Sequence, residues 1–341
     1  MANVTKLEEI FDNTWQHLNP ERNYWLRGLS GSAISLFLRS GHLTAKKNIL
    51  LIASDKEKAA YLMNDLEELL PESKVLFFPE TYRQPYHPEK TTNANIQERA
   101  ETLNLLSRET FKGVVVTYPQ ALCEKVTRKK LLHKNTLQIK KGEKLSVEFI
   151  SEFLSSFSFQ HADFVYEPGQ FSIRGGIIDI YSYANEYPYR IELFGNEVEA
   201  IKTFDPSNQL SNASFDFITI IPNINSSVFN EEKGLLTAYF DVPDTLLCFE
   251  DIEYACDVFD KKLESARQIY DAYAGEVAQA EPRKLYAGAE ELKEQVKNFN
   301  CIEFGIRTSL GQAATNFNQQ PQPSFNKNFE LLINNLKENK A

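Results

Sequence analysis

The residues Gly28–Ser35, which read GLSGSAIS, nearly match a loop that binds nucleotide phosphates. In that loop, GxxxxGK[ST], the glycines let backbone N–H groups surround the phosphates, the lysine reaches the β- and γ-phosphates, and the hydroxyl binds Mg²⁺. This chain keeps Gly28 and Ser35 but has Ala33 for the second glycine and Ile34 for the lysine. An isoleucine cannot donate to a phosphate. We therefore interpret the loop as a glycine turn into a helix, with a weak anion site at the helix N-terminus as the alternative.

A pair of carboxylates that could serve the same chemistry follows an apolar strand. LLCFED ends in Glu250 and Asp251, and a nucleotide site needs acidic groups at such a strand end to hold Mg²⁺. Many strands end in this way, so the pair is weak support by itself. The five histidines are scattered, and no serine or cysteine has a histidine nearby in a recognisable motif. We predict neither a catalytic centre nor a metal site.

The cationic residues are unevenly distributed along the chain. The formal net charge of −10 argues against binding of nucleic acid by the whole surface. From Lys125 to Lys144, however, eight lysines and arginines accompany one glutamate. A solvated face is the simpler interpretation of this run. The alternative is direct DNA binding, which would depend strongly on salt concentration.

The elements around the glycine loop alternate between strands and helices. Short, continuous apolar runs predict buried strands over Asn48–Ser54, Lys74–Pro79 and Gly113–Tyr118. Helical spacing follows the glycine loop, follows a candidate N-cap at Asp55, and recurs over residues 96–107. This alternation predicts an α/β lobe with a parallel sheet and helices on both faces.

The chain becomes β-rich from Phe164 to Phe204. In the run YRIELF, alternation places Tyr189, Ile191 and Leu193 on one face of a strand, and Arg190, Glu192 and Phe194 on the other. The following Gly195-Asn196 is the signal of a two-residue hairpin turn. With the helix predicted just before it, this region is interpreted as a small, separate α+β domain.

Size and composition set broader limits. A chain of 341 residues exceeds what one compact core usually holds, so we expect two or three domains. It contains no apolar run of about eighteen residues that would span a membrane, and its N-terminus lacks the apolar segment of a signal peptide. The four cysteines are widely spaced and predict buried free thiols in a cytoplasmic protein.

Over its whole length, the chain resembles the N-terminal region of the bacterial transcription-repair coupling factor (Mfd) family, which is itself similar to the excision-repair protein UvrB. The most specific segment is Glu167–Ser211, where RGGIIDIY is followed by PYRIELFGNEVE. The stretches FFPETYRQPYHPEK, NANIQERAETLNLL and VVVTYPQAL match less specifically.

The resemblance implies a RecA-like parallel-sheet lobe with a degenerate phosphate loop, an inserted small α+β domain that binds UvrA, and a mixed helical second insert. The implied boundaries are 1–124 for the lobe, 125–213 for the UvrA-binding domain, 214–312 for a region like domain 1b of UvrB, and 313–341 for a return segment.

The resemblance also accounts for the glycine loop. The equivalent loop is intact in UvrB and has decayed in the coupling factors, as it has here over Gly28, Gly31, Ala33, Ile34 and Ser35. Only a short segment separates Phe78 from the helix at Ile96, so we expect the DNA-clamping hairpin of UvrB to be absent. RNA polymerase and DNA would bind through further domains, including an ATP- and Mg-dependent translocase, that are missing here. The chain is therefore expected to be a fragment without a cofactor of its own.

In this family the β-rich domain binds UvrA, and the matching positions here are Arg174, Arg190 and Phe194. An aromatic residue beside an arginine on a polar strand face also resembles an interface hot spot. The structural alternative puts Phe194 under the hairpin turn, pairs Arg190 with Glu192, and gives Arg174 hydrogen bonds to nearby carbonyls.

Three further residues of the same signature, Glu167, Gly169 and Asp179, are interpreted as fold-forming. The leading hypothesis is a non-catalytic module that recruits UvrA to lesion-stalled RNA polymerase. The alternative is an ATP-binding subunit of a UvrB-type repair helicase.

Overall fold

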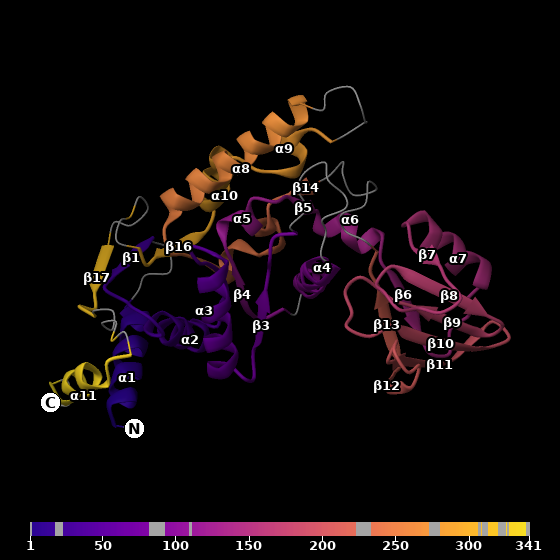
Figure 1. The fold of residues 1–341 in the computed structure, drawn as a ribbon, viewed down its shortest axis with the longest axis horizontal. Helices are drawn as coiled ribbons and strands as arrows, with labels where there is room; N and C mark the ends of the chain where they lie inside the picture. The colour runs from indigo at the N-terminus through magenta and orange to yellow at the C-terminus, as the bar shows by residue number, and fades with distance from the viewer. Residues whose placement is uncertain are drawn as a thin grey trace.

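The structure, a computed structural model, describes residues 2–17, 23–81, 93–108, 111–222, 233–272, 280–305, 308, 313–319, 325 and 327–338. Two bodies are evident in Figure 1: a larger lobe built on one sheet, and a smaller body that carries a second sheet at one end of the molecule. Each has its own core of buried side chains.

The lobe is organised around a seven-stranded sheet in which all neighbouring strands are parallel. Its order is β17 (Ala313–Asn316), β1 (Tyr24–Arg27), β16 (Asn300–Glu303), β15 (Thr245–Phe249), β2 (Asn48–Ile52), β4 (Gly113–Thr117) and β3 (Lys74–Phe77). The central strands β15, β2 and β4 are buried at every residue, as expected for strands covered on both faces. The glycine loop follows β1, at the carboxyl edge of this sheet.

The helices of the lobe lie in two groups on either side of the sheet (Figure 1). One group is α1 (Ala2–His17), α2 (Ala33–Ala45) and α3 (Lys56–Leu69), and the other is α5 (Pro119–Leu122), α8 (Ile252–Ala272), α9 (Pro282–Leu285) and α10 (Ala289–Val296). Helix α4 (Asn93–Ser107) lies between β3 and β4 in the chain, and α11 (Phe329–Glu338) follows β17. Short elements complete the lobe: β5 (Val126–Thr127), β14 (Lys233–Gly234), and the 3₁₀ turns Leu236–Tyr239 and Val242–Asp244.

The smaller body contains a six-stranded mixed sheet covered by one helix. The sheet order is β12 (Ser211–Phe215), β11 (Glu197–Phe204), β10 (Tyr189–Phe194), β9 (Ile177–Ile180), β8 (Gln170–Arg174) and β7 (Gln160–His161). Helix α7 (Val147–Ser156) packs its buried side chains into the core on the inner face of this sheet. Chain entry and exit lie side by side, because β6 (Leu137–Lys140) pairs antiparallel with β13 (Phe217–Ile220), just beyond α6 (Lys129–Lys134).

The predicted α/β lobe with a separate small domain is confirmed. The strands predicted at 48–54, 74–79 and 113–118 are present, and Asp55 caps α3 by accepting a hydrogen bond from the Lys58 N–H at 2.9 Å. The predicted boundaries of the four regions stay a prediction; the second core runs from Ile139 to Ile220.

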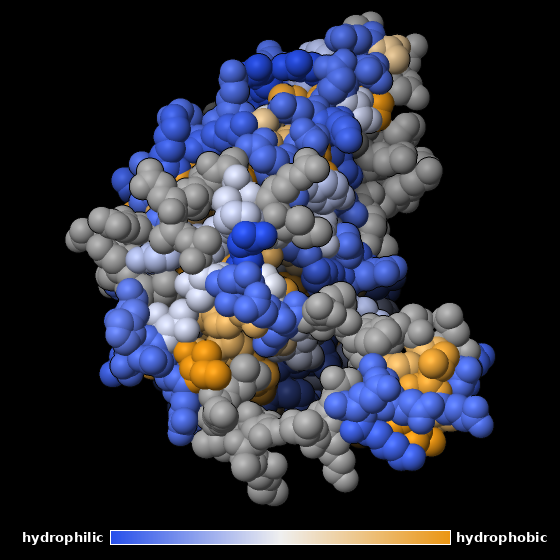
Figure 2. Space-filling model, turned by 90° about the vertical axis from the view of Figure 1, so that its left-hand side faces the viewer, coloured by the Kyte–Doolittle hydropathy of each residue, from blue (hydrophilic) through white to orange (hydrophobic). Residues whose placement is uncertain are grey.

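Figure 2 shows the end of the molecule that carries β17 and α11, where most described residues are hydrophilic and hydrophobic residues surface in small groups. Within the described part of the chain, no helix combines the length and the apolar character that crossing a bilayer requires. The predicted free cysteines are confirmed, and all four are buried. Burial raises the pKa of the Cys256 thiol to about 11.

Candidate functional site

The register of three neighbouring strands brings charged residues together on the outer face of the six-stranded sheet, the face opposite α7. Ser172 on β8 and Arg190 on β10 both pair with Asp179 on the intervening β9. Two residues further along each strand, and so on the same face, Arg174 and Glu192 both pair with Ile177. The tight turn at Gly175-Gly176, with Gly175 at φ +61°, sets the β8–β9 register and so places Arg174 beside Asp179.

The carboxylate of Asp179 binds both arginines. Arg190 donates from Nε to Oδ1 at 2.7 Å and from Nη2 to Oδ2 at 2.9 Å, in a two-point fork. Arg174 donates from Nη2 to Oδ2 at 2.6 Å. Asp179 has no exposed surface, whereas the side chain of Arg190 is 16% exposed and that of Arg174 is 35% exposed. The hydrogen bonds to Asp179 raise the pKa of Arg190 above its usual value.

Each guanidinium also lies over an aromatic ring. The guanidinium carbon of Arg174 is 4.7 Å from the ring centre of Phe164, and that of Arg190 is 4.3 Å from the ring centre of Phe204. Arg190 further donates to the side-chain oxygen of Gln209 at 3.1 Å. The planes of both arginines are therefore fixed from more than one side.

Phe194 ends β10, next to the hairpin turn, and is 79% exposed. Gly195 in that turn has φ +62°, which a side chain would disfavour. The predicted alternation along Tyr189–Phe194 is confirmed, because Tyr189 and Ile191 are buried in the core and Phe194 faces solvent. A phenylalanine exposed to this extent contributes little to its own core.

The structure shows which internal partners the two arginines have. Arg190 does not pair with Glu192; that carboxylate instead accepts from Lys202 Nζ at 2.8 Å. Arg174 does donate to a carbonyl, that of Asp163, in addition to Asp179. The part of Asp179 in joining the arginines was not predicted. The alternation of side chains along β9 could have placed Asp179 with the arginines. Ile178 and Ile180 face the core, so Asp179 between them must face the outer side of the sheet.

The glycine loop is engaged by a segment from the far end of the chain. Gln319 donates its backbone N–H to the Gly28 carbonyl at 3.0 Å, and its side-chain oxygen accepts from the Ser30 N–H at 3.2 Å. Gly28 has φ +71°, and a Cβ at this position would lie 2.9 Å from the backbone nitrogen of Asn318. A loop donor of the kind that would face a phosphate is thus occupied by an amide oxygen of the same chain.

The altered positions of the loop also serve the fold. Ile34 is buried and lines the pocket beside the loop, where a lysine would have reached the phosphates. Ser35 is fully buried and donates to Asp65 Oδ2 on α3 at 3.2 Å, so its hydroxyl is used between two helices. Ala33 begins α2 and packs against the core.

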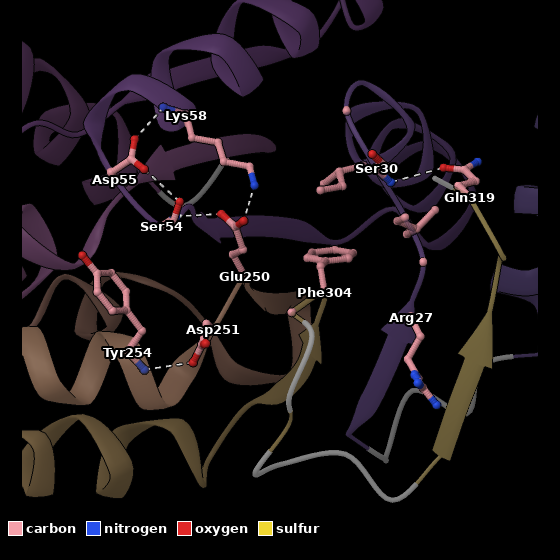
Figure 3. A pocket seen from close by; sticks show the side chains of 15 residues that line it. Arg27, Ser30, Ser54, Asp55, Lys58, Glu250, Asp251, Tyr254, Phe304 and Gln319 are labelled. Atoms are coloured by element: carbon pink, nitrogen blue, oxygen red, sulfur yellow. Dashed lines mark hydrogen bonds and ion pairs between the residues drawn. The ribbon is translucent and has the colours of Figure 1, made fainter. Parts of the chain in front are cut away.

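A pocket of about 780 Å³ remains at the carboxyl edge of the sheet. Figure 3 shows Lys58 and Glu250 on one side, Ser30 and Gln319 on the other, and Phe304 between them. Glu250 forms an ion pair with Lys58 and accepts from the Ser54 N–H at 2.8 Å. The neighbouring Asp251 accepts from the Tyr254 N–H at 2.9 Å at the start of α8. The acidic strand end therefore has partners within the protein.

The cationic run from Lys125 to Lys144 is largely solvated. Lys125 pairs with Glu291 at 2.7 Å. The exposed members that have no ion-pair partner among the described residues are Arg128, Lys130, Lys134, Lys140, Lys141 and Lys144. Within the described ranges, no three His, Cys, Asp or Glu side chains converge as a metal site would require. The expected absence of a DNA-clamping hairpin falls mostly on residues 82–92, outside the described residues.

Comparison with known proteins found similarity to one domain family and to two kinds of DNA-repair protein. The family described as the UvrB interaction domain matches residues 137–225, the body that carries Arg174, Asp179, Arg190 and Phe194. The chain is 32% identical over 211 residues to a transcription-repair-coupling factor of Bacillus subtilis, an alignment that covers 61% of this chain and 18% of the relative. It is 27% identical over 174 residues to the transcription-repair-coupling factor of Escherichia coli, covering 51% of this chain and 15% of the relative.

A second kind of relative is also similar. The UvrABC system protein B of Methanococcus maripaludis is 26% identical over 227 residues, which is 63% of this chain and 35% of that protein. The chain matches less than a fifth of the length of the two transcription-repair-coupling factors.

Proposed function

Since residues 137–225 form a UvrB interaction domain, in a chain homologous to the transcription-repair-coupling factors, we propose that this chain is an adaptor that binds UvrA through the outer face of the six-stranded sheet. Arg174, Arg190 and Phe194 would make the contact. The adaptor would recruit UvrA, in the cytoplasm, to RNA polymerase stalled at a lesion. Contacts with polymerase and DNA, and ATP-driven translocation, would belong to other domains of such a factor.

The observation that carries this proposal is Phe194, exposed at the end of the strand that also carries Arg190, in a sheet where Asp179 holds both arginines. Interface hot spots are enriched in aromatic residues and arginines that are already held in place. An arginine pair supplies directional contacts, and an exposed ring supplies apolar area that a partner's pocket would bury.

The test is calorimetric titration of UvrA with the wild-type chain and with Phe194→Ala. We expect the substitution to cost about 2 kcal/mol of binding free energy or more. Phe149→Ala is a matched control, because Phe149 is another exposed phenylalanine of this domain, on α7 and away from the outer face. Unchanged affinity in Phe194→Ala would remove this residue from the interface. Absence of wild-type binding would contradict the proposed function.

We further propose that the lobe acts as a scaffold without nucleotide. The support is the use of the Ser30 N–H by Gln319, the isoleucine at position 34, and the ion pair that occupies Glu250. Equilibrium dialysis should detect no ATP or ADP on the chain at millimolar nucleotide with Mg²⁺. Saturable binding would instead favour an ATP-binding repair subunit of the UvrB type.

The exposed cations of the Lys125–Lys144 run favour one secondary candidate, direct contact with DNA phosphates. Binding of duplex DNA by this chain should then weaken steeply as salt is raised, and Lys130→Glu should weaken it further. A chain that fails to bind DNA at low salt would leave this run as a solvated face.

A further inference from the structure

We propose that Asp179 is a positioning residue for partner binding: it holds Arg174 and Arg190 as one unit whose surplus positive charge receives a carboxylate of UvrA. This inference rests on the proposed function and adds to it the chemistry of the partner group. It also changes the interpretation of Asp179, which was predicted only to form the fold.

The burial of Asp179 shows how it can act. Its carboxylate has no exposed surface, so a partner protein cannot touch it in this conformation. Each of its oxygens accepts from Arg190, and Oδ2 also accepts from Arg174 at 2.6 Å. A buried carboxylate is costly unless it is paired, and here one anion is shared by two cations. Asp179 can therefore influence a partner only through the two arginines.

The charge balance of this cluster leaves one positive charge uncompensated. Two guanidinium groups face a single carboxylate, and the neighbouring Glu192 is engaged by Lys202 at 2.8 Å. Among the residues that the structure describes, no other carboxylate lies within ion-pair distance of either arginine. The outer face therefore favours an anionic group on its partner.

The exposed part of the cluster is Arg174. Its side chain is more than twice as exposed as that of Arg190, and its Nε makes no hydrogen bond to any described residue. A planar guanidinium with a free N–H edge suits a carboxylate, which it can bind at two points. Because Asp179 and Phe164 already fix that plane, an incoming carboxylate would find the donor in place and lose little rotamer entropy on binding.

The first experiment needs only the wild-type chain. Nitrogen-15 NMR of arginine side chains should show restricted guanidinium rotation for Arg174 and Arg190, compared with the exposed Arg283 on α9. Equal mobility of all three would overturn the proposal, whatever the behaviour of any variant.

The second experiment titrates UvrA with Asp179→Asn, a nearly isosteric change that removes the charge, and with Glu192→Gln as the matched control. We expect Asp179→Asn to weaken binding by at least about tenfold, and Glu192→Gln to remain within about twofold of wild type. In a chain that already carries Arg174→Gln, Asp179→Asn should cost less than it does alone, because it acts through the arginine. The affinity of the wild type should also fall as salt rises.

The outcomes separate the two proposals. A folded Asp179→Asn variant that binds UvrA as tightly as wild type would overturn the positioning role and leave the adaptor function intact. Equal additive losses in the two backgrounds would also overturn it. A wild-type chain that does not bind UvrA would overturn the adaptor function, and this inference with it.

Discussion

The glycine loop and the outer face of the six-stranded sheet both present groups suited to binding, but the two regions differ in what already occupies those groups. At the loop, the side-chain oxygen of Gln319 accepts a hydrogen bond from the Ser30 N–H, and Lys58 forms an ion pair with Glu250. On the sheet, Asp179 joins two arginines and leaves a surplus charge, and Phe194 packs against nothing that buries it. The comparison teaches that a retained motif shape says less about function than whether its polar groups still lack partners.

We expect the largest effect on stability from substitution of Phe204, whose ring lies under the guanidinium of Arg190. Phe204 is fully buried under Arg190, so Phe204→Ala should lower the free energy of unfolding of the small domain by about 3–5 kcal/mol. Urea denaturation, followed by a probe in this domain, measures the change. A loss below about 1 kcal/mol would mean that the outer face is not a rigid platform, and the contrast with the loop would weaken.

Two glycines of the loop provide the next test. Gly28→Ala should cost about 2 kcal/mol, because it combines a left-handed φ of +71° with a contact of 2.9 Å to Asn318. Gly31→Ala should cost only about 1 kcal/mol, because its φ is +57° but its surroundings are open. Denaturation midpoints of the lobe give both values. Equal costs would show that the approach of residues 316–319 is not what requires Gly28.

A carboxylate of the pocket should behave as part of the fold. Asp55 accepts the Lys58 N–H, which lowers the pKa of Asp55. Asp55→Ala should therefore cost about 1 kcal/mol near neutral pH. The stabilisation is present above the carboxyl's usual pKa and is lost as pH falls through the lowered one, so the gap between wild type and variant should close in acid. A gap that persists unchanged at low pH would contradict a role that depends on the ionised carboxylate.

The smallest effect on stability is expected from the residue with the largest expected effect on binding. Because Phe194 is 79% exposed, Phe194→Ala should change the free energy of unfolding by less than about 0.5 kcal/mol. Differential scanning calorimetry of the free chain provides the measurement. A substantial loss of stability would give Phe194 a structural role and reduce the contrast between the two regions.

Local sequence patterns predicted most of the fold because the forces behind them act over a few residues. Continuous apolar runs marked the buried parallel strands. Ser146 is a residue of the type that caps helices, and its hydroxyl accepts the Phe149 N–H at 3.2 Å at the start of α7. Helix α2 runs to Ala45 and ends where Lys46 adopts the left-handed conformation, with its N–H donated to the His42 carbonyl. Because the capping residue is a lysine and not a glycine, the local sequence held no signal for this end.

The candidate site was predicted less completely, because its contacts cross between strands. The alternative pair Arg190–Glu192 joins residues two apart on one strand, roughly 7 Å from each other, whereas a directly opposed residue on the next strand is closer, at roughly 5 Å. Arg190 and Asp179 are directly opposed in this way, which favours their pairing. Glu192 lies opposite Ala200 and is reached diagonally by the long side chain of Lys202. The contact of Gln319 with the glycine loop had no local signal at all, since 289 positions separate Ser30 from Gln319.

The antiparallel pairing of β6 with β13 has a consequence for how the smaller body can exist inside the larger one. The chain enters and leaves the smaller body at Leu137 and Ile220, which are paired with each other. For the seven-stranded sheet, the inserted segment of more than eighty residues is therefore equivalent to a short loop. If the smaller body unfolded, this connection would become a flexible loop several times longer. Each doubling of a flexible loop costs the lobe about 0.6 kcal/mol in closure entropy, so three doublings cost about 2 kcal/mol. The folded small domain therefore spares the lobe this loss of loop-closure entropy. A domain whose two ends lie side by side can in the same way be inserted into another fold at little entropic cost.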